Sequence, residues 1–178
     1  MRSKYILPGL IVIFILLQIL GMGERVKDKD NTAPAAATSA TPEIGLTDLN
    51  GNSVKLSDFY GKAVLLSFFA TWCPPCRTEM PIIEKLKTYM AGEEFVVLVV
   101  NVQEPDARVA AFIKENNYTF RVLLDSEGLL SRYYQVRSIP TSFLLDKTGK
   151  VQRKVVGAVD WMEDPLLKLI KDTINIDG

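Results

Sequence analysis

Two cysteines carry the clearest chemistry in this chain, and they lie in one run, Trp72-Cys73-Pro74-Pro75-Cys76. A single Cys-x-x-Cys pair after a block of strand-forming residues is typical of a redox dithiol. If the pair opens a helix, the two sulfurs can meet and the first thiol lies at the electropositive end of that helix. The spacing therefore predicts thiol-disulfide exchange, in which Cys73 attacks a partner disulfide and Cys76 resolves the mixed disulfide.

A zinc site and inert packing are the alternative interpretations of the pair. A structural zinc site needs about four ligands, whereas the chain has no third cysteine and no histidine. A site shared between two chains stays open on this count, but the chain alone is expected to hold no metal and no other cofactor. The prolines between the cysteines favour a helix start at the surface over inert packing. The lack of histidine also excludes Cys-His and Ser-His hydrolases.

The overall size and charge indicate one ordinary domain without a polyanionic partner. The chain has 178 residues, and its 21 basic and 21 acidic side chains are interspersed and give a net charge of zero. Nucleic-acid-binding domains usually carry a clustered basic patch, which this sequence lacks. We therefore expect one globular domain and no nucleic-acid partner.

The N-terminal segment, residues 1–22, is predicted to be a membrane anchor or an uncleaved signal. Residues 5–22 are almost wholly apolar and follow Arg2 and Lys4. A helix of this length spans about 27 Å, which is just enough for the hydrocarbon core of a bilayer. Positive charge before the segment predicts a cytoplasmic N-terminus and export of the rest. A cleaved signal peptide is the alternative, since Gly21-Met22-Gly23 offers a weak cleavage site, and it also places the dithiol outside the cytoplasm.

Residues 23–42 are predicted to be a flexible linker because they are polar, rich in Ala and Pro, and show no apolar periodicity. The globular domain is expected over residues 43–178. Its apolar patterns alternate between strand and helix periods. They predict a hairpin at 44–56, strands at 63–69, 95–100, 121–124, 141–145 and 151–156, and helices after the dithiol, at 106–116, at 127–134 and from Asp164. This order predicts an α/β domain with a mixed central sheet and helices on both faces.

The sequence also predicts which side chains two of the helices bury and where the last helix begins. The helix after the dithiol is expected to bury a stripe of side chains. That stripe comprises Ile82, Ile83, Leu86, Tyr89 and Met90. The last helix is expected to begin with Asp164 as N-cap and Pro165 as its first residue, and to bury Leu166, Leu167, Ile170 and Ile174.

The chain resembles the thioredoxin superfamily, and within it the membrane-anchored TlpA/ResA type. The resemblance rests on the strand and dithiol AVLLSFFATWCPPC at residues 63–76, on Pro81, and on Ser138-Ile139-Pro140-Thr141 before a strand. The N-terminal anchor, the hairpin with its lead-in at residues 56–62, and an extra helix-strand unit between Asn101 and Leu129 indicate the TlpA/ResA type. The resemblance covers the chain from Glu43 onward and implies a thioredoxin-like fold.

The resemblance also implies roles for residues beyond the dithiol. Pro140 corresponds to the cis-proline of the family, which lies across from the dithiol. The backbone of Ile139 would then pair with an extended partner segment as an added strand. Trp72 would give that partner a flat apolar surface, although a core tryptophan is the alternative.

Proton handling is expected to differ from thioredoxin. Ser67 stands where thioredoxin has a buried aspartate, so it cannot act as that base. Glu79, one helical turn after Cys76, matches an acidic residue of ResA-like proteins and is predicted to modulate the thiols; a solvated first-turn glutamate is the alternative. Glu104 and Arg137 could tune partner choice, but ordinary surface loop residues are the favoured interpretation for both.

The resemblance implies an enzyme, a thiol-disulfide oxidoreductase in the inner membrane, single-pass, with its domain on the periplasmic or equivalent side. ResA-like members reduce partner-protein disulfides such as that of apocytochrome c and draw electrons from a membrane-embedded donor. A disulfide oxidase or isomerase and a non-catalytic binding module are the alternatives. A peroxide-reducing role fits less well, because the dithiol lies at a thioredoxin-like position.

Overall fold

The computed structural model describes residues 41–176. The expected anchor at 1–22 lies outside the described residues, and so does the expected linker up to residue 40. Thr41, at the end of the expected linker, is buried, and its hydroxyl shares a hydrogen bond of 2.5 Å with the Tyr60 hydroxyl. Within residues 41–176, no helix has the length and apolar character needed to cross a membrane.

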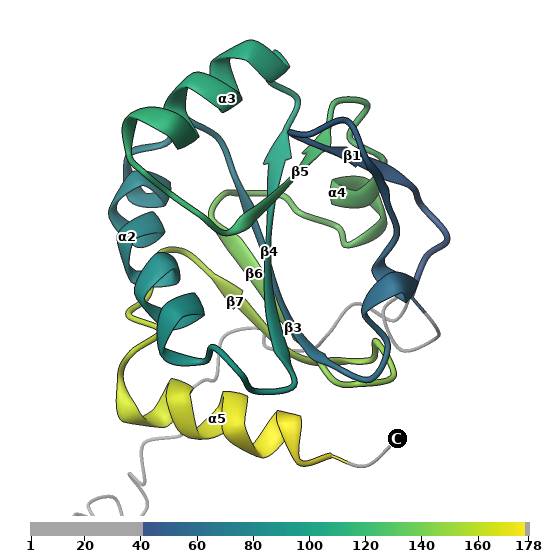
Figure 1. Cartoon of the computed structure of the whole chain (residues 1–178), viewed down its shortest axis with the longest axis vertical. Helices are drawn as coiled ribbons and strands as arrows, with labels where there is room; N and C mark the ends of the chain where they lie inside the picture. The colour runs from purple at the N-terminus through teal and green to yellow at the C-terminus, as the bar shows by residue number, and fades with distance from the viewer. Residues whose placement is uncertain (1–40, 177–178) are drawn as a thin grey trace, which may run out of the picture. The chain divides into compact units, whose positions relative to one another are not determined.

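A seven-stranded mixed sheet forms the centre of the domain, with the strand order β2-β1-β5-β4-β3-β6-β7 (Figure 1). The strands are β1 (Leu46–Asp48), β2 (Ser53–Val54), β3 (Ala63–Phe69), β4 (Phe95–Val102), β5 (Arg121–Asp125), β6 (Thr141–Leu145) and β7 (Val151–Val156). The neighbours β3, β4 and β5 are parallel, and the remaining pairs are antiparallel. The predicted mixed α/β sheet is confirmed, with the N-terminal hairpin and the inserted helix-strand unit.

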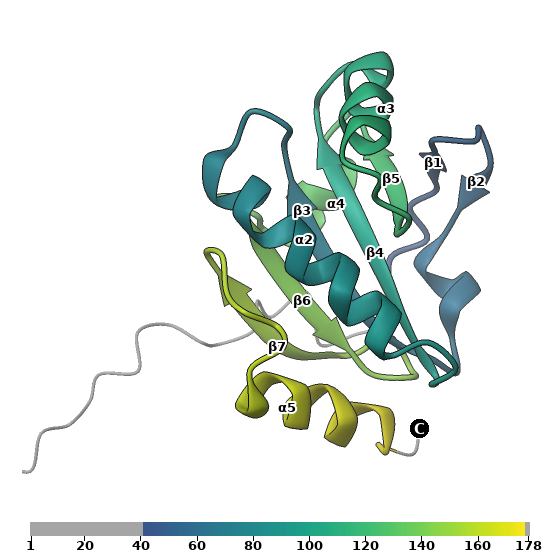
Figure 2. The same cartoon turned by 60° about the vertical axis from the view of Figure 1, so that its left-hand side comes forward.

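Helices cover both faces of this sheet, as Figure 2 shows. They are the 3₁₀ helix η2 (Leu56–Phe59) and the α-helices α2 (Pro74–Tyr89), α3 (Asp106–Glu115), α4 (Leu129–Tyr133) and α5 (Asp164–Ile174). Buried side chains of α2, α3 and α5 form the core on one face. The other core contains side chains from α4, η2 and the β1–β2 hairpin. The helix expected at 127–134 is shorter, because Gly128 takes a left-handed conformation (φ 67°) and the helix begins after it.

Strand β3 contributes to both cores, which explains its unbroken apolar sequence. Successive side chains of a strand point to opposite faces. Leu65 and Phe69 therefore pack in the core under α2. Leu66 and Phe68 pack in the core under α4. All seven residues of β3 are buried, as expected for a central strand of a sheet that helices cover on both faces.

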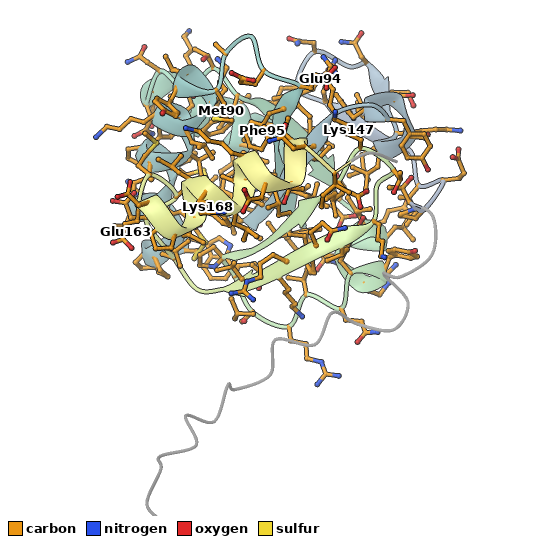
Figure 3. The ribbon with its side chains drawn as sticks, turned by 90° about the horizontal axis from the view of Figure 1, so that it is seen from below. Met90, Glu94, Phe95, Lys147, Glu163 and Lys168 are labelled. Atoms are coloured by element: carbon orange, nitrogen blue, oxygen red, sulfur yellow. A yellow bond between two sulfur atoms is a disulfide. The ribbon has the colours of Figure 1, made fainter. Side chains whose placement is uncertain are left out.

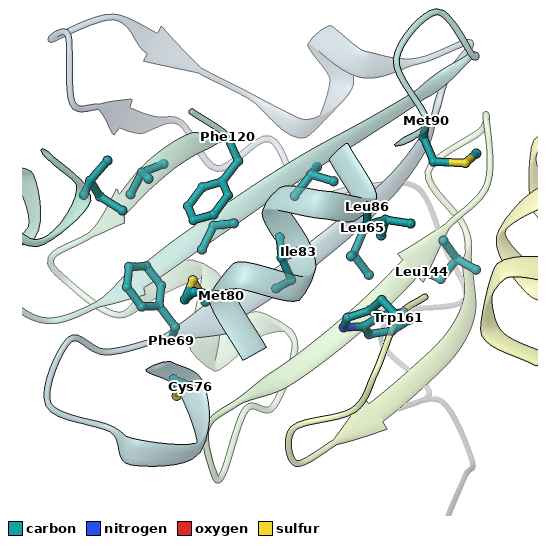
Figure 4. Close-up of a cluster of buried hydrophobic side chains, with 14 of the residues drawn as sticks. Leu65, Phe69, Cys76, Met80, Ile83, Leu86, Met90, Phe120, Leu144 and Trp161 are labelled. Atoms are coloured by element: carbon teal, nitrogen blue, oxygen red, sulfur yellow. The ribbon is translucent and has the colours of Figure 1, made fainter. Parts of the chain in front are cut away.

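The stripe expected on α2 was wrong at two positions. Figure 4 shows Met80, Ile83 and Leu86 within the core on this face, and all three are fully buried. Tyr89 is instead 54% exposed, and Ile82 is only half-buried. The buried face includes Cys76 and Glu79, which an apolar pattern does not count. Because Cys76 and Glu79 belong to the buried face, that face is centred away from Ile82 and Tyr89.

The start of α5 also differs from the expectation. Glu163 is the N-cap, with an extended backbone, and Asp164 and Pro165 are the first two helical residues. The Glu163 carbonyl accepts the first backbone hydrogen bonds, from the amides of Leu166 and Leu167. Asp164 therefore stabilises the helix through its charge in the first turn rather than as a cap. Ile170 and Ile174 are buried as expected, whereas Leu166 and Leu167 are half-buried.

The end of the sheet opposite the dithiol is closed by contacts between loops. Lys147, in the β6–β7 turn, forms an ion pair of 2.7 Å with Glu94 before β4, and the two lie together in Figure 3. The Lys147 carbonyl also accepts a hydrogen bond from the Gly61 amide, and the Glu94 carbonyl accepts one from Ala63. These contacts hold the start of β3, so its far end carries Cys73 into a defined position.

The corrected face of α2 makes a stability prediction. We expect Ile83→Ala to lower the free energy of unfolding by about 2–5 kcal/mol, because it leaves a cavity in a packed core. Tyr89→Ala is the matched control on the same helix and is expected to cost less than about 1 kcal/mol. Urea denaturation at neutral pH measures both. Equal costs for the two variants would contradict the burial pattern.

Candidate redox site

The two cysteines meet at the start of α2, as their spacing predicts. They form a disulfide, with 5.3 Å between their Cα atoms. Cys73 is the N-cap of α2, and its sulfur accepts a hydrogen bond of 3.3 Å from the Cys76 amide. Pro74 and Pro75 occupy the first helical positions, where a missing amide hydrogen costs nothing. Cys76 is fully buried and Cys73 is 3% exposed, so Cys73 is the sulfur nearer to the surface.

The loop before β6 faces the dithiol. The Ile139–Pro140 peptide bond is cis, which confirms the expectation for Pro140. The Ile139 carbonyl oxygen lies 3.7 Å from the Cys73 sulfur. The Pro140 carbonyl accepts a hydrogen bond from Gly157 and is thereby tied to the end of β7. The structure thus brings Cys73 and Ile139 together, as the resemblance implied.

A groove of about 480 Å³ lies beside the dithiol, between Trp72 and the cis-proline loop. Trp72 is 64% exposed, which excludes the alternative of a core tryptophan. Ile139 and Val136 add apolar surface to the groove, and Arg137 lines it as an exposed side chain. The rest of the lining is mainly polar, so the groove offers a partner both apolar surface and hydrogen-bonding groups.

Glu104 was expected to be a surface loop residue, and this expectation is wrong. Its carboxylate is buried and accepts hydrogen bonds from the Thr71 amide and the Thr71 hydroxyl, each at 2.6 Å. It also accepts one of 2.7 Å from the Asn101 side chain. A buried carboxylate needs such donors. Glu104 therefore anchors the segment that carries Trp72 and Cys73, although it lies more than 30 residues away in the sequence.

Ser67, in strand β3, carries no charge. It is fully buried, and its hydroxyl accepts a hydrogen bond of 2.9 Å from the Ser142 hydroxyl across the β3–β6 pair. Two neutral hydroxyls satisfy one another at this position. The position of the thioredoxin aspartate thus contributes no carboxylate here.

Glu79 is fully buried, which excludes the alternative of a solvated glutamate. Its Oε1 accepts hydrogen bonds from the Trp161 indole at 2.8 Å and from the Val159 amide at 3.4 Å. Its Oε2 has no hydrogen-bond partner among the described residues. Burial raises the pKa of Glu79 to about 7, and the bonds from Trp161 and Val159 oppose this rise. A carboxyl group that titrates near neutral pH thus lies one helical turn from Cys76.

These features define a thioredoxin-fold protein with a redox-active Cys-x-x-Cys pair at a helix N-terminus and a cis-proline opposite to it. The family model of the AhpC/TSA family matches residues 37–154. The thiol-disulfide oxidoreductase ResA of Geobacillus thermodenitrificans is 34% identical over 158 residues, which cover 89% of this chain and 91% of that protein. The chain belongs to the AhpC/TSA family and, within it, to the ResA-type thiol-disulfide oxidoreductases.

Further relatives support this assignment. The thioredoxin-like protein YneN of Bacillus subtilis is 40% identical over 120 residues, which cover 66% of this chain and 70% of that protein. Among solved structures, a putative thiol:disulfide interchange protein DsbE from Chlorobium tepidum has 32% identity and a TM-score of 0.71, with 78% of this chain and 97% of that chain covered.

Trp161 was missed by the reasoning from sequence. It lies between β7 and α5, 82 residues from Glu79, and is fully buried. Its only signal in the sequence was a tryptophan in a short polar loop, which has no local pattern to connect it with the dithiol. The contact becomes visible only when the fold brings that loop against α2.

The buried carboxyl group of Glu79 makes a prediction about pH. Because its pKa is about 7 in the folded protein and 4.5 ordinarily, its contribution to stability is fully present below pH 4.5 and is lost as the pH rises through about 7. We expect Glu79→Gln to avoid this loss. Urea denaturation measures the free energy of unfolding of the variant relative to that of the unsubstituted oxidised protein. This difference should change by about 3 kcal/mol in favour of the variant as the pH rises from 4.5 to 8. A difference that does not change with pH would contradict the raised pKa.

The anchoring role of Glu104 makes a second prediction. Glu104→Ala leaves the amide and hydroxyl of Thr71 and the amide of Asn101 without their acceptor, so we expect a loss of about 2–3 kcal/mol in stability. Hydrogen exchange should accelerate at the Thr71 amide more than in the centre of β3. Glu127→Ala, at an exposed carboxylate, is the control. Unchanged protection of the Thr71 amide in Glu104→Ala would show that Glu104 does not hold this segment.

Proposed function

We propose that this chain is a membrane-anchored, extracytoplasmic reductant of disulfides in partner proteins. One observation supports this proposal above all others: the Cys73–Cys76 pair lies at the start of α2, next to the Ile139 carbonyl and a groove with both apolar and polar side chains. An extended partner segment in this groove could pair with the Ile139 backbone as an added strand. Its disulfide would then lie beside Cys73.

The reaction transfers two electrons from the dithiol to the partner. The Cys73 thiolate attacks one sulfur of the partner disulfide, so that bond breaks, a mixed disulfide forms, and the other partner sulfur leaves as a thiolate that takes a proton. The Cys76 thiolate then attacks the Cys73 sulfur. The Cys73–Cys76 disulfide forms, and the second partner sulfur leaves and is protonated. The partner is reduced, and the chain ends in the oxidised state that the structure shows.

The position of each sulfur fits these roles. The N-cap position exposes the Cys73 sulfur to the helix dipole and to the Cys76 amide, and both stabilise a thiolate. Cys76 has no exposed surface, so a partner disulfide cannot reach it directly. Its proton must leave within the protein. Glu79, buried one turn away with a pKa near neutral, is the proposed acceptor of that proton.

The location and the client are also part of the proposal. The apolar segment after Arg2 and Lys4 supports an anchor with its N-terminus in the cytoplasm and the domain on the periplasmic or equivalent side. The resemblance to ResA-like proteins supports apocytochrome c as the client and a membrane-embedded protein as the electron donor.

Oxidation or isomerisation of disulfides is the competing direction. The direction of electron flow depends on the reduction potential, and about 30 mV corresponds to about 1.4 kcal/mol for this two-electron couple. A Cys73 thiol pKa near 3.5 would favour an oxidant, whereas one near 7 or above would favour a reductant. Titration of the reduced protein with a thiol-alkylating reagent distinguishes the two. A non-catalytic binding module would instead keep its biological function in the Cys73→Ser, Cys76→Ser double variant.

The order of attack leads to a trapping prediction. Cys76→Ser removes the resolving thiol, so the mixed disulfide between Cys73 and a disulfide-bonded Cys-x-x-Cys-His peptide should accumulate, as detected by mass spectrometry. Cys73→Ser is the matched control and should trap little or no peptide, because Cys76 is buried. Trapping by Cys73→Ser and not by Cys76→Ser would reverse the assignment of the two thiols. The same Cys76→Ser variant, applied to an extract of the source membrane, would identify the client.

A further inference from the structure

We propose that Trp161 is a positioning residue for proton transfer at this site, because its indole fixes one oxygen of Glu79 and leaves the other to exchange the proton of Cys76. This inference rests on the proposed function, in which Glu79 accepts that proton. It assigns a second residue, from a distant part of the chain, to the chemistry of the dithiol.

The geometry of the contact is that of a buried, fixed hydrogen bond. The Trp161 indole nitrogen lies 2.8 Å from Oε1 of Glu79, and both side chains are fully buried. Trp161 belongs to the same core cluster as Cys76, Met80 and Ile83, and all four are labelled in Figure 4. Packing on all sides therefore holds the indole in one orientation.

The indole is suited to this role because it only donates. Its N–H cannot accept a hydrogen bond, and it does not titrate. It can therefore stabilise the carboxylate form of Glu79 without competing for the proton. The Val159 amide contributes a second, longer bond to the same oxygen. With two donors directed at Oε1, the proton that Glu79 takes up must reside on Oε2, which has no partner among the described residues.

After burial, the Trp161 bond has the strongest influence on the pKa of Glu79, and no charged side chain is among the causes of its shift. On α2, Arg77 lies over the Phe112 ring and is exposed. In the β7–α5 segment, Asp160 is exposed and accepts a hydrogen bond from the Met162 amide. In the core cluster itself, the two cysteines are joined in the disulfide and do not titrate in this state, and the half-buried Tyr118 packs against the cluster. The pKa of Glu79 accordingly reflects burial, the Trp161 bond and the Val159 bond, with no contribution from a neighbouring charge.

This balance has a consequence for exchange. Burial raises the pKa of Glu79, and the bond from the indole N–H lowers it. Without this N–H, Glu79 would therefore hold its proton to higher pH. A protonated Glu79 cannot accept the proton of Cys76, so the resolving step would need a higher pH. The Trp161 bond would thus set the pH range over which the mixed disulfide is resolved.

Trp161→Phe tests the proposal, because it removes the N–H and keeps an aromatic ring in the core. In the reduced protein, the carboxyl group of Glu79 is followed directly through its infrared or ¹³C NMR signal against pH. A hydrogen bond to a charged group is worth about 1.5–3 kcal/mol, so we expect the titration of Glu79 to move up by about one to two pH units. The rate at which Cys76 resolves a preformed mixed disulfide should show the same shift.

Two further variants guard against a purely structural effect. Benzothienylalanine at position 161 keeps the shape of tryptophan and lacks the N–H, so it should reproduce the shift even if Trp161→Phe is unstable. Ile170→Val trims the same core without changing any hydrogen bond and should leave the titration of Glu79 in place. In the Glu79→Gln background, Trp161→Phe should have no further effect on the pH profile of resolution.

The outcomes separate this inference from the proposed function. If Glu79 titrates at the same pH in Trp161→Phe and in the benzothienylalanine variant, the inference is overturned, and the proposed function is unaffected. If the titration of Glu79 shifts but the pH dependence of resolution does not, the proposed link between Trp161 and thiol-disulfide exchange is overturned. A pH profile of Glu79→Gln identical to that of the unsubstituted protein would then also remove Glu79 from the proposed mechanism. A shift in both measurements that disappears in the Glu79→Gln background supports the inference.

Discussion

The burial of β3 on both faces is the constraint on which the rest of this structure depends. All seven of its residues are buried, and it pairs with β4 on one side and β6 on the other. Because β3 is fixed in this way, the segment that follows it begins at a fixed position at one end of the sheet. That segment contains Cys73, and the antiparallel neighbour β6 begins at the same end of the sheet, just after Pro140. The meeting of the dithiol and the cis-proline loop therefore follows from the pairing of two buried strands.

Much of this arrangement could be predicted from the sequence because its signals are local. The unbroken apolar run of β3, the period of α2 and the two prolines after Cys73 each act within a few residues. The face of α2 was predicted with errors at Ile82 and Tyr89, since the periodicity was counted on apolar side chains alone. Cys76 and Glu79 are buried on that helix although one is reactive and the other is acidic. When such residues are buried, the apolar side chains alone do not indicate which face of the helix is buried.

The parts that could not be predicted are contacts between distant segments. Glu104, which follows β4, accepts hydrogen bonds from Thr71, which follows β3, and Trp161 donates one to Glu79 from a loop near the C-terminus. A glutamate in a loop and a tryptophan in a polar turn have no local pattern that would point to such partners. In both cases the physical signal is the cost of burying a carboxyl group, which requires donors that only the folded chain supplies. The hydrogen-bond partners of each buried carboxyl group therefore identify these residues in the folded structure.

Glu79 and Glu104 show how one fold gives two buried carboxyl groups different tasks. Glu104 accepts three hydrogen bonds, which engage both of its oxygens, and it holds the backbone before the dithiol in place. Glu79 has donors on Oε1 only, and Oε2 is left without one among the described residues. The donors on both oxygens hold Glu104 in place, whereas burial raises the pKa of Glu79 to about 7 and the bonds to its Oε1 oppose this rise. The number of donors around each group therefore distinguishes the carboxylate that holds a backbone segment from the one that we propose for proton transfer. This distinction does not depend on either residue's distance from the sulfurs in the sequence.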